Sequence, residues 1–315
     1  MELVGIIHEK WGTKSEYCWM VLKKWGMRVT CGAFAVCGTI KQKLYEVTYM
    51  KYGFIGLGNM ASAIIRGMAG SGNFPQGSIL GFNRSEGKTL ALAEEVGLVP
   101  MKSIPALVQA ADVVVLAVKP QMMEDVLPLA EPWVTKNKTV ITIAAGKPCA
   151  YYEEVFGENV AVVRVMPNIA ARVLSAASGI CGGRYAQPHH VEIAKEMFST
   201  IGTVYEVSEA LFPAFSALGG ASGAFIHLYI DALASAGVKH GLPRPMAQEL
   251  ACQAVLGAAK LTLQSDLHPV QLADQVCSPG GTTIEGVHTL KRLGFESAVQ
   301  QAVDAVVEKD RRLGS

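Results

Sequence analysis

The sequence has little charge and almost no imbalance between the two signs. Of its 315 residues, 28 are Lys or Arg and 27 are Asp or Glu, so 17% are charged and the formal net charge is +1. Such a balance gives no electrostatic surface for nucleic acid or an anionic membrane. The chain is nevertheless 50% hydrophobic, which excludes a disordered protein. A chain of this length forms about two domains, each with its own core.

The seven cysteines lack the spacing of a metal or redox motif. No Cys-x-x-Cys occurs, and the four cysteines after residue 50 are scattered over positions 149, 181, 252 and 277. We therefore expect reduced thiols, buried or in loops, in the cytoplasm, and no metal site. The adjacent His189 and His190 have no Cys or acidic partner at ligand spacing, so we predict that they lie in a solvated loop.

The first 49 residues differ from the rest of the chain. They hold seven Lys or Arg against four Glu, a net charge of +3, and leave −2 for the remainder. No helical or strand period runs through them, and their longest apolar stretch, residues 31–40, is too short to span a membrane. No small-residue cleavage site follows a clean apolar run. We predict a poorly ordered N-terminal extension over residues 1–49, with Met50 as a natural start.

Apolar runs alternate with helical patterns after this extension. Runs typical of strands occupy residues 51–55, 78–82, 112–118, 138–145 and 159–165. The run at 112–118 is almost wholly apolar, as a central parallel strand should be. Strands that alternate with helices predict an α/β fold, a Rossmann-type doubly wound parallel sheet.

A Gly-x-Gly-x-x-Ala motif lies between the first strand and the first helix. Gly56 permits a tight turn, Gly58 lets the backbone approach a pyrophosphate, and Ala61 lets the helix pack on the strand. Within a βαβ unit the motif predicts dinucleotide binding, and the alternative is an empty structural turn. The residues predicted to bind the cofactor here are Gly56, Leu57, Gly58, Asn59, Met60 and Ala61.

The end of the second strand indicates which dinucleotide binds. NAD sites usually place an acidic residue there for the ribose hydroxyls, but this chain has Asn83, Arg84 and Ser85. Arg84 can hold a 2′-phosphate, and its neighbours can add hydrogen bonds. NADPH is therefore favoured over NADH, which stays possible. The alternative for Arg84 is an exposed residue at a helix start.

Two later loops follow strand ends, where ligands bind such sheets. One is Val118, Lys119 and Pro120, and the other contains Ala145 and Gly146. Small residues there let a nicotinamide ring lie against the backbone. We predict that both loops contact the cofactor, although each also suits an ordinary turn.

The second half of the chain is rich in helix formers. The stretch from Phe212 to Val238 is long and apolar, but it contains His227 and Asp231. It predicts a buried helix at a subunit interface rather than a membrane span. With a second Ala-rich helix over residues 251–263, it predicts at least an intertwined homodimer.

A sharp loop precedes a later helix. Pro279 stiffens the turn, while Gly280 and Gly281 leave backbone amides free to point at a ligand. Thr282, three residues before Glu285, has the pattern of a capping box. The loop therefore predicts a site for a small carboxylate at a helix N-terminus, with a well-capped helix start as the alternative.

These motifs together resemble one family. From about Met50 to the C-terminus the chain resembles pyrroline-5-carboxylate reductase, and the stretch Ser278-Pro-Gly-Gly-Thr-Thr283 is the most specific part of the match. The other matching segments are Gly56-Leu-Gly-Asn-Met-Ala61, Val118-Lys-Pro120, Ala144-Ala-Gly146, Arg164-Val-Met-Pro-Asn168, Ala236-Gly-Val-Lys-His-Gly-Leu-Pro243, His268-Pro269 and Leu272-Ala-Asp-Gln-Val-Cys277.

The resemblance implies NAD(P)H-dependent reduction of 1-pyrroline-5-carboxylate to L-proline. It implies an NADP-binding domain over residues 50–208 and an all-α dimerisation and substrate domain over residues 209–315, with dimers that build into a larger ring. It further implies that Gly281, Thr282 and Thr283 hold the substrate, with Thr283 as the catalytic residue. It places Glu209 near the substrate and Gln275 on the cofactor.

The chain departs from the family pattern at three places. Residues 220–225 lack the Pro and Tyr usual at the start of the long helix, Ile169-Ala170 replaces Thr-Pro, and an Asn near Ser103-Ile104 is absent. These changes leave a non-catalytic NADPH-binding paralog as an alternative. A β-hydroxyacid dehydrogenase is a weaker one, because it needs a catalytic Lys on the long helix and residues 220–233 contain none.

Overall fold

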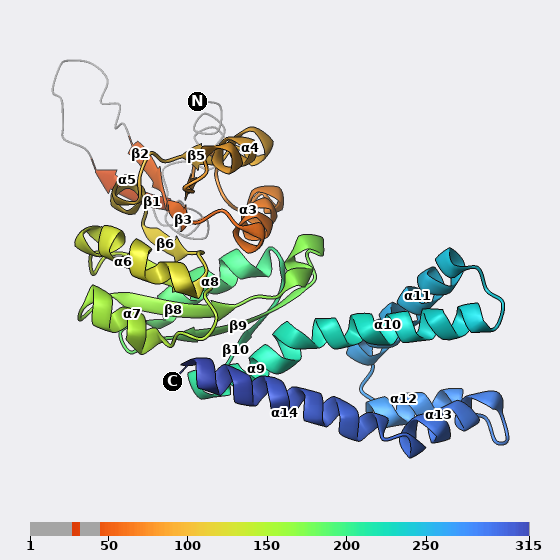
Figure 1. Ribbon diagram of the computed structural model, residues 1–315. Helices are drawn as coiled ribbons and strands as arrows, with labels where there is room; N and C mark the ends of the chain where they lie inside the picture. The colour runs from red at the N-terminus through yellow and green to blue at the C-terminus, as the bar shows by residue number, and fades with distance from the viewer. Residues whose placement is uncertain (1–26, 32–44, 315) are drawn as a thin grey trace, which may run out of the picture. The chain divides into compact units, whose positions relative to one another are not determined.

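The structure is a computed structural model that describes residues 27–31 and 45–314. The chain divides into two compact units, Met1–Val207 and Ser208–Ser315. Figure 1 shows the β-sheet with its helices in the first unit and only helices in the second.

The first unit is built on an eight-stranded sheet with the order β10-β9-β8-β7-β6-β3-β4-β5. Neighbouring strands are parallel except β8 and β9, which are antiparallel. Within this sheet the chain enters at β3 and continues through β4 to β5. It then crosses back to β6 on the other side of β3, so the strand order reverses beside β3. The strands are β3 Tyr52–Ile55, β4 Ile79–Phe82, β5 Val99–Pro100, β6 Val113–Leu116, β7 Thr139–Thr142, β8 Ala161–Met166, β9 Ala176–Gly182 and β10 Gly202–Glu206.

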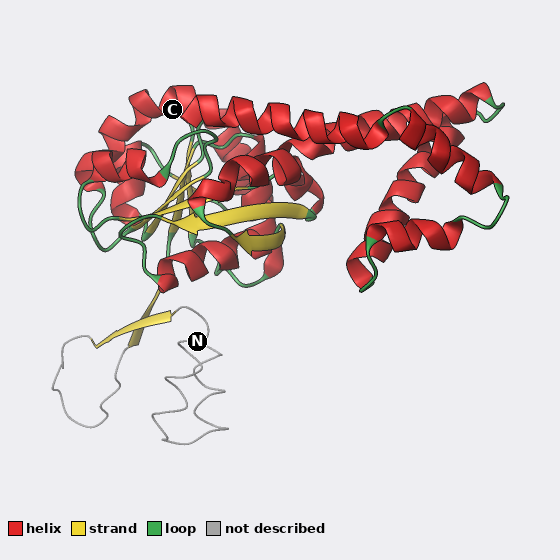
Figure 2. Cartoon of the chain, turned by 90° about the horizontal axis from the view of Figure 1, so that it is seen from below, coloured by secondary structure: helices red, strands yellow, loops and turns green. Residues whose placement is uncertain are grey.

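Helices cover both faces of this sheet (Figure 2). Ile64 of α3 and Phe198 of α8 are buried in one core with Phe54 of β3. On the other face, a Cβ at Gly53 would lie 2.5 Å from Leu107 Cδ2, so the glycine lets α5 pack closely on β3. The helices are α3 Asn59–Ser71, α4 Glu86–Val96, α5 Ile104–Ala110, α6 Met123–Ala130, α7 Cys149–Phe156 and α8 Pro188–Ser199, with short 3-10 turns η1 Pro120–Met122, η2 Glu131–Trp133 and η3 Ile169–Val173.

The predicted α/β class, a Rossmann-type parallel sheet followed by an all-α part, is confirmed. The five predicted strands are present but shorter, because the ends of the apolar runs form loops; the run 138–145 contains only β7. β5, β9 and β10 were not predicted. The loop predicted around His189 and His190 is wrong, because both residues lie in the first turn of α8, where His190 Nδ1 accepts a hydrogen bond from the Gln187 N–H at 2.9 Å.

Part of the N-terminal extension forms two strands. β1 Met27–Cys31 pairs antiparallel with β2 Tyr45–Tyr49. The sequence showed no strand period there, so these strands were not predicted. The poor order expected for the remaining residues up to 44 falls outside the described part of the chain.

The second unit is helical, and its longest apolar stretch is interrupted. The predicted helix over residues 212–238 consists of α9 Phe212–Phe215, a π-helical turn η5 Ser216–Ala221 and α10 Ser222–Lys239. The adjacent Gly219 and Gly220 lie in the π-helical turn. The other elements are η4 Glu209–Leu211, α11 Arg244–Gln264, α12 Pro269–Val276, α13 Thr282–Arg292 and α14 Phe295–Gly314.

Small residues hold α10 against α11. Ala234, Ala247 and Ala251 are buried between the two helices, and a Cβ at Gly237 would lie 3.1 Å from Ala247 Cβ. Most larger apolar side chains of this unit are exposed, including Leu228 of α10 at 72%. By length and composition alone, the stretch Glu209–Lys239 is long and apolar enough to cross a membrane. Only 11% of its most apolar 18 residues are buried within the described chain. The unit therefore presents a broad apolar surface.

Candidate functional site

Four loops follow the carboxyl ends of neighbouring parallel strands in the first unit. They come after β7, β6, β3 and β4, which is also the order of these strands in the sheet. Because the strand order reverses at β3 and β6, these loops border the crevice where doubly wound sheets bind ligands. The sequence-predicted cofactor residues of the first unit all lie in these loops or in the helix start that follows.

The loop after β3 is the glycine-rich one. Gly56 has φ +94°, and a Cβ there would lie 2.7 Å from Val118 Cγ1, so both conformation and space require glycine. A Cβ at Gly58 would meet no atom within 4 Å, which leaves open space where a phosphate must approach. α3 begins at Asn59 without a side-chain cap, so amides of its first turn stay available to an anion.

The loop after β4 is tied to the glycine-rich loop. The Leu57 N–H donates a hydrogen bond to Asn83 Oδ1 at 3.2 Å, and Asn83 Nδ2 donates to the Ser85 carbonyl at 3.1 Å. Arg84 and Ser85 are exposed beside this bridge. Because no acidic residue stands at positions 83–85, the arrangement fits a 2′-phosphate.

A groove of about 460 Å³ adjoins the glycine-rich loop. Leu57 and Asn59 line it together with Lys88 of α4 and Arg172 of η3. Arg66 and Glu95 also line the groove and form an ion pair at 2.6 Å. Lys88 and Arg172 add positive charge next to a helix N-terminus, which favours a negatively charged ligand.

The loops after β6 and β7 are the other two of the four strand-end loops. Val118 is half-buried and packs beside Gly56, while Lys119 is exposed and Pro120 begins a 3-10 turn. After β7, Gly146 has φ +79°, and Ala145 is exposed. Ala145 has a short exposed side chain and the buried Gly146 has none, so this position leaves room for a flat ring.

Polar groups that the sequence assigned no role lie on β7, β8 and α7. Thr142 pairs in register with Arg164, which is 8% exposed. Tyr152 of α7 is fully buried, and burial raises its pKa to about 12. Arg164 lies in a segment that matches the family pattern, whereas Thr142 and Tyr152 belong to no motif, so only the folded chain brings these groups together.

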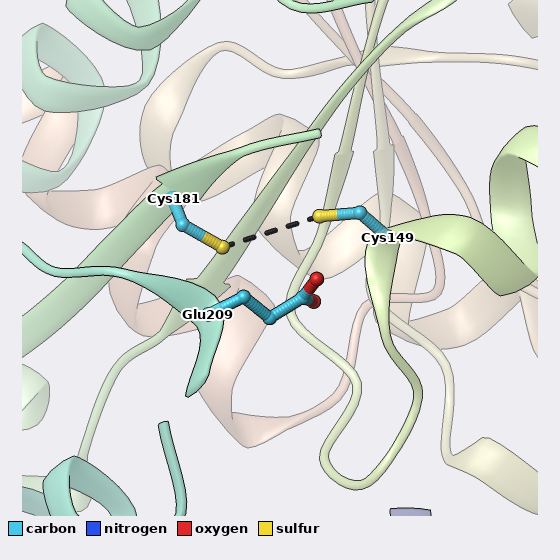
Figure 3. Close-up of side chains that lie close together, drawn as sticks. All are labelled: Cys149, Cys181 and Glu209. Carbon is cyan, nitrogen blue, oxygen red and sulfur yellow. Dashed lines mark hydrogen bonds between the residues drawn. The ribbon is translucent and has the colours of Figure 1, made fainter. Parts of the chain in front are cut away.

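Two cysteines lie next to these groups. Cys149, the first residue of α7, has its Sγ 4.0 Å from Sγ of Cys181 in β9 (Figure 3). The cysteines are buried, as expected, but their proximity was not predicted, because 32 residues separate them.

The second unit contains the loop predicted to hold a carboxylate. Gly280 has φ +67°, and Gly281 is the N-cap of α13. A Cβ at Gly281 would collide with the Ser278 side chain, which explains the second glycine. The predicted capping box of Thr282 and Glu285 is wrong, because the helix already begins at Thr282 and no side chain caps it. The helix start thus keeps its backbone amides for a ligand.

The remaining predicted residues are distributed over the second unit. Thr282 and Thr283 are exposed in the first turn of α13, and Gln275 is exposed near the end of α12. Glu209 opens η4. Their approach to the cofactor residues of the first unit stays a prediction.

Two family descriptions match the chain. Residues 209–313 match "Pyrroline-5-carboxylate reductase dimerisation". Residues 51–146 match "NADP oxidoreductase coenzyme F420-dependent". The two matches fall on the helical part and on the part that carries the glycine-rich loop, respectively.

Similar proteins match this chain over nearly the whole of their own length. Pyrroline-5-carboxylate reductase from Methanosarcina acetivorans is 41% identical over 264 residues, which cover 84% of this chain and 98% of the relative. The solved pyrroline carboxylate reductase from Plasmodium falciparum, with NADP bound, is 30% identical with a TM-score of 0.76, covering 84% of this chain and 98% of its own. The Coxiella burnetii enzyme structure is 32% identical with a TM-score of 0.80, covering 84% and 99%. The chain therefore belongs to the pyrroline-5-carboxylate reductase family.

Proposed function

We propose that this chain reduces 1-pyrroline-5-carboxylate to L-proline with NADPH. One observation carries the proposal furthest: α13 begins at a glycine N-cap without a side-chain cap, in the loop that is most specific to the family. Such a helix start binds a small carboxylate through backbone amides. The resemblance to reductases over nearly their whole length supports the same reaction.

The cofactor binds along the four strand-end loops of the first unit. The amides at the start of α3 receive the pyrophosphate, and Arg84 with Ser85 receives the 2′-phosphate. NADPH supplies the hydride when bound. Val118–Pro120 and Ala145–Gly146 support the nicotinamide end, and Gln275 of the second unit adds a contact. NADH is a weaker alternative, because no carboxylate at 83–85 binds its ribose hydroxyls.

The substrate is held by residues of the second unit. The amides at Gly281 and Thr282 fix its carboxylate, and the Thr283 hydroxyl hydrogen-bonds the ring nitrogen. Glu209 lies near the ring. Orientation of the imine carbon toward the cofactor is the main catalytic contribution, since a protonated imine accepts hydride readily.

Residues 50–208 form the NADP-binding domain, and residues 209–315 form the domain for dimerisation and substrate binding. The exposed apolar side chains of the second unit support a homodimer, which in turn builds into a larger ring. Small-molecule biosynthesis of this kind places the protein in the cytoplasm, with no nucleic acid or membrane partner.

The test is NADPH oxidation by the full chain with 1-pyrroline-5-carboxylate and with its six-membered homologue. Turnover is expected with the five-membered substrate, and Thr283→Ala should lower kcat/KM by about tenfold or more through the lost hydrogen bond. Thr289→Ala, an exposed position on the same helix, is the matched control.

One outcome contradicts the proposed reaction, and another contradicts only the role of Thr283. NADPH binding without turnover of either imine indicates a non-catalytic paralog, which the altered residues 220–225 would explain. Unchanged kcat/KM in Thr283→Ala removes the catalytic role from that residue but leaves the reaction in place.

A further inference from the structure

Cys149 and Cys181 form a buried dithiol close to a predicted cofactor loop. Their sulfur atoms lie 4.0 Å apart, and the residues are 2% and 5% exposed. Cys149 follows Gly146 by three residues, while Cys181 lies near the end of β9. In Figure 3 the two side chains point toward each other from α7 and β9.

Charged and polar groups surround the pair, among them the Glu209 carboxylate, which lies within 4.8 Å of both sulfur atoms. Arg164 of β8 is in register with Cys181 of β9, so the two side chains lie on the same face of the sheet. Cys149 occupies the first position of an eight-residue helix. Attack on an oxidant proceeds through the thiolate form of cysteine, and the 4.0 Å separation places the second sulfur within reach of the first.

We propose that Cys149 and Cys181 close to a reversible disulfide in the presence of a peroxide, and that closure slows the reductase. The Cys149 thiolate attacks the O–O bond and becomes a sulfenic acid, while one oxygen leaves as water. The Cys181 thiolate then attacks that sulfur, an S–S bond forms, and the second oxygen leaves as water. Two thiols lose two electrons in total, and the peroxide gains them.

Closure requires movement near the cofactor loop. A disulfide has an S–S length of about 2.05 Å, so the sulfur atoms must approach by about 2 Å. β9 is hydrogen-bonded between β8 and β10, whereas α7 starts directly after a loop. The start of α7 therefore moves more easily, and with it the segment that contains Ala145 and Gly146. The effect on turnover rests on the function proposed above.

The first measurement needs no turnover. The full chain is treated with hydrogen peroxide, alkylated, digested without reductant and mapped by mass spectrometry. We expect a peptide pair linked through Cys149 and Cys181, lighter by two hydrogen atoms and separated by dithiothreitol. The proposal would be overturned if both Cys149 and Cys181 were found alkylated after peroxide treatment and no linked peptide pair were detected. Because it follows only the bond, this result stands even if the reductase function fails.

The second measurement follows NADPH oxidation. Peroxide should lower the rate by about fivefold or more, because cofactor orientation changes, and dithiothreitol should restore it. Cys149→Ala and Cys181→Ala should keep their rates in peroxide. Cys252→Ser, which removes an exposed thiol of α11, should remain sensitive. A linked pair with an unchanged rate would overturn the regulatory role.

Discussion

The backbone N–H of Leu57 donates a hydrogen bond to Oδ1 of Asn83 at 3.2 Å. This bond joins the glycine-rich loop after β3 to the loop after β4, two segments that the adenosine half of a dinucleotide has to span. Asn83 also donates to the Ser85 carbonyl, so one side chain fixes both loops relative to each other. The site proposed for the 2′-phosphate is therefore preorganised in the chain without its cofactor.

Replacing Asn83 should weaken cofactor binding. Asn83→Ala removes both hydrogen bonds, and each is worth about 1 kcal/mol. A loss of about 2 kcal/mol should raise KM for NADPH by roughly 30-fold, with a smaller change in kcat. The measurement is steady-state kinetics at saturating imine. Asn137→Ala, an exposed residue before β7, is the control, and equal KM in both variants would contradict the role of Asn83.

Replacing Arg84 should change the preference between cofactors. Arg84→Ala should raise KM for NADPH by about tenfold, because a charge-assisted bond to the 2′-phosphate is lost, and should leave KM for NADH nearly unchanged. Lys136→Ala removes an exposed positive charge from the loop before β7, at the amino end of that strand, and serves as control. Parallel losses with both cofactors would show that Arg84 does not contact the phosphate.

The two glycines of the phosphate loop should respond differently. Gly56→Ala should lower thermal stability, because φ is +94° and the new Cβ would collide with Val118. Gly58→Ala has free space around its Cβ, so it should keep its Tm and lose affinity for NADPH. Tm without ligand and a fluorescence titration separate the two effects. A Tm drop in Gly58→Ala as large as that in Gly56→Ala would refute this distinction.

His190 should make stability depend on pH. Burial and the neighbouring His189 lower the pKa of His190 below its usual 6.5, and its Nδ1 accepts the Gln187 N–H only when unprotonated. The folded state thus prefers neutral His190. Its contribution to stability is complete above pH 6.5 and is lost as the pH falls through the lowered value.

Urea unfolding at several pH values checks this expectation. The free energy of unfolding should fall more steeply below pH 6.5 in the wild-type protein than in His190→Gln. His288→Gln, on exposed α13, should keep the wild-type slope. Identical slopes in all three proteins would remove His190 from the explanation.

The exposed apolar face of α10 should govern association. Leu228→Asp places a charge where the side chain is 72% exposed in the single chain, so a dimer that buries this position should dissociate. Light scattering after size exclusion should then give the mass of one chain. Leu90→Asp, 59% exposed on α4 of the first unit, should elute like the wild type. An unchanged mass for Leu228→Asp would contradict the proposed interface.

The five strands with long apolar runs were predictable, whereas β5, β9 and β10 were not. β3, β6 and β7 are wholly buried and read as apolar runs. β10 has mostly exposed or half-buried positions, so its sequence carries no such run. The antiparallel direction of β9 depends on pairing across the sheet rather than on its own residues.

The same division holds for the candidate site. Glycine loops were recognisable because their chemistry needs a local order of residue types, as in Gly56-x-Gly58. The proximity of Cys149 and Cys181, and the register that sets Arg164 beside Cys181, arise only when distant segments meet. The capping box at Thr282 failed because the pattern also fits a helix that begins one residue earlier.

The close contact of α10 and α11 restricts how this region can change in evolution. Gly237 faces Ala247, and even one added methyl group would lie only 3.1 Å from Ala247 Cβ. Ala234 and Ala251 are buried in the same contact. A larger side chain at any of these positions would separate the axes of α10 and α11 and displace the residues that follow on both helices. Sequence drift at these positions is therefore confined to the smallest amino acids, whichever substrate the protein acquires.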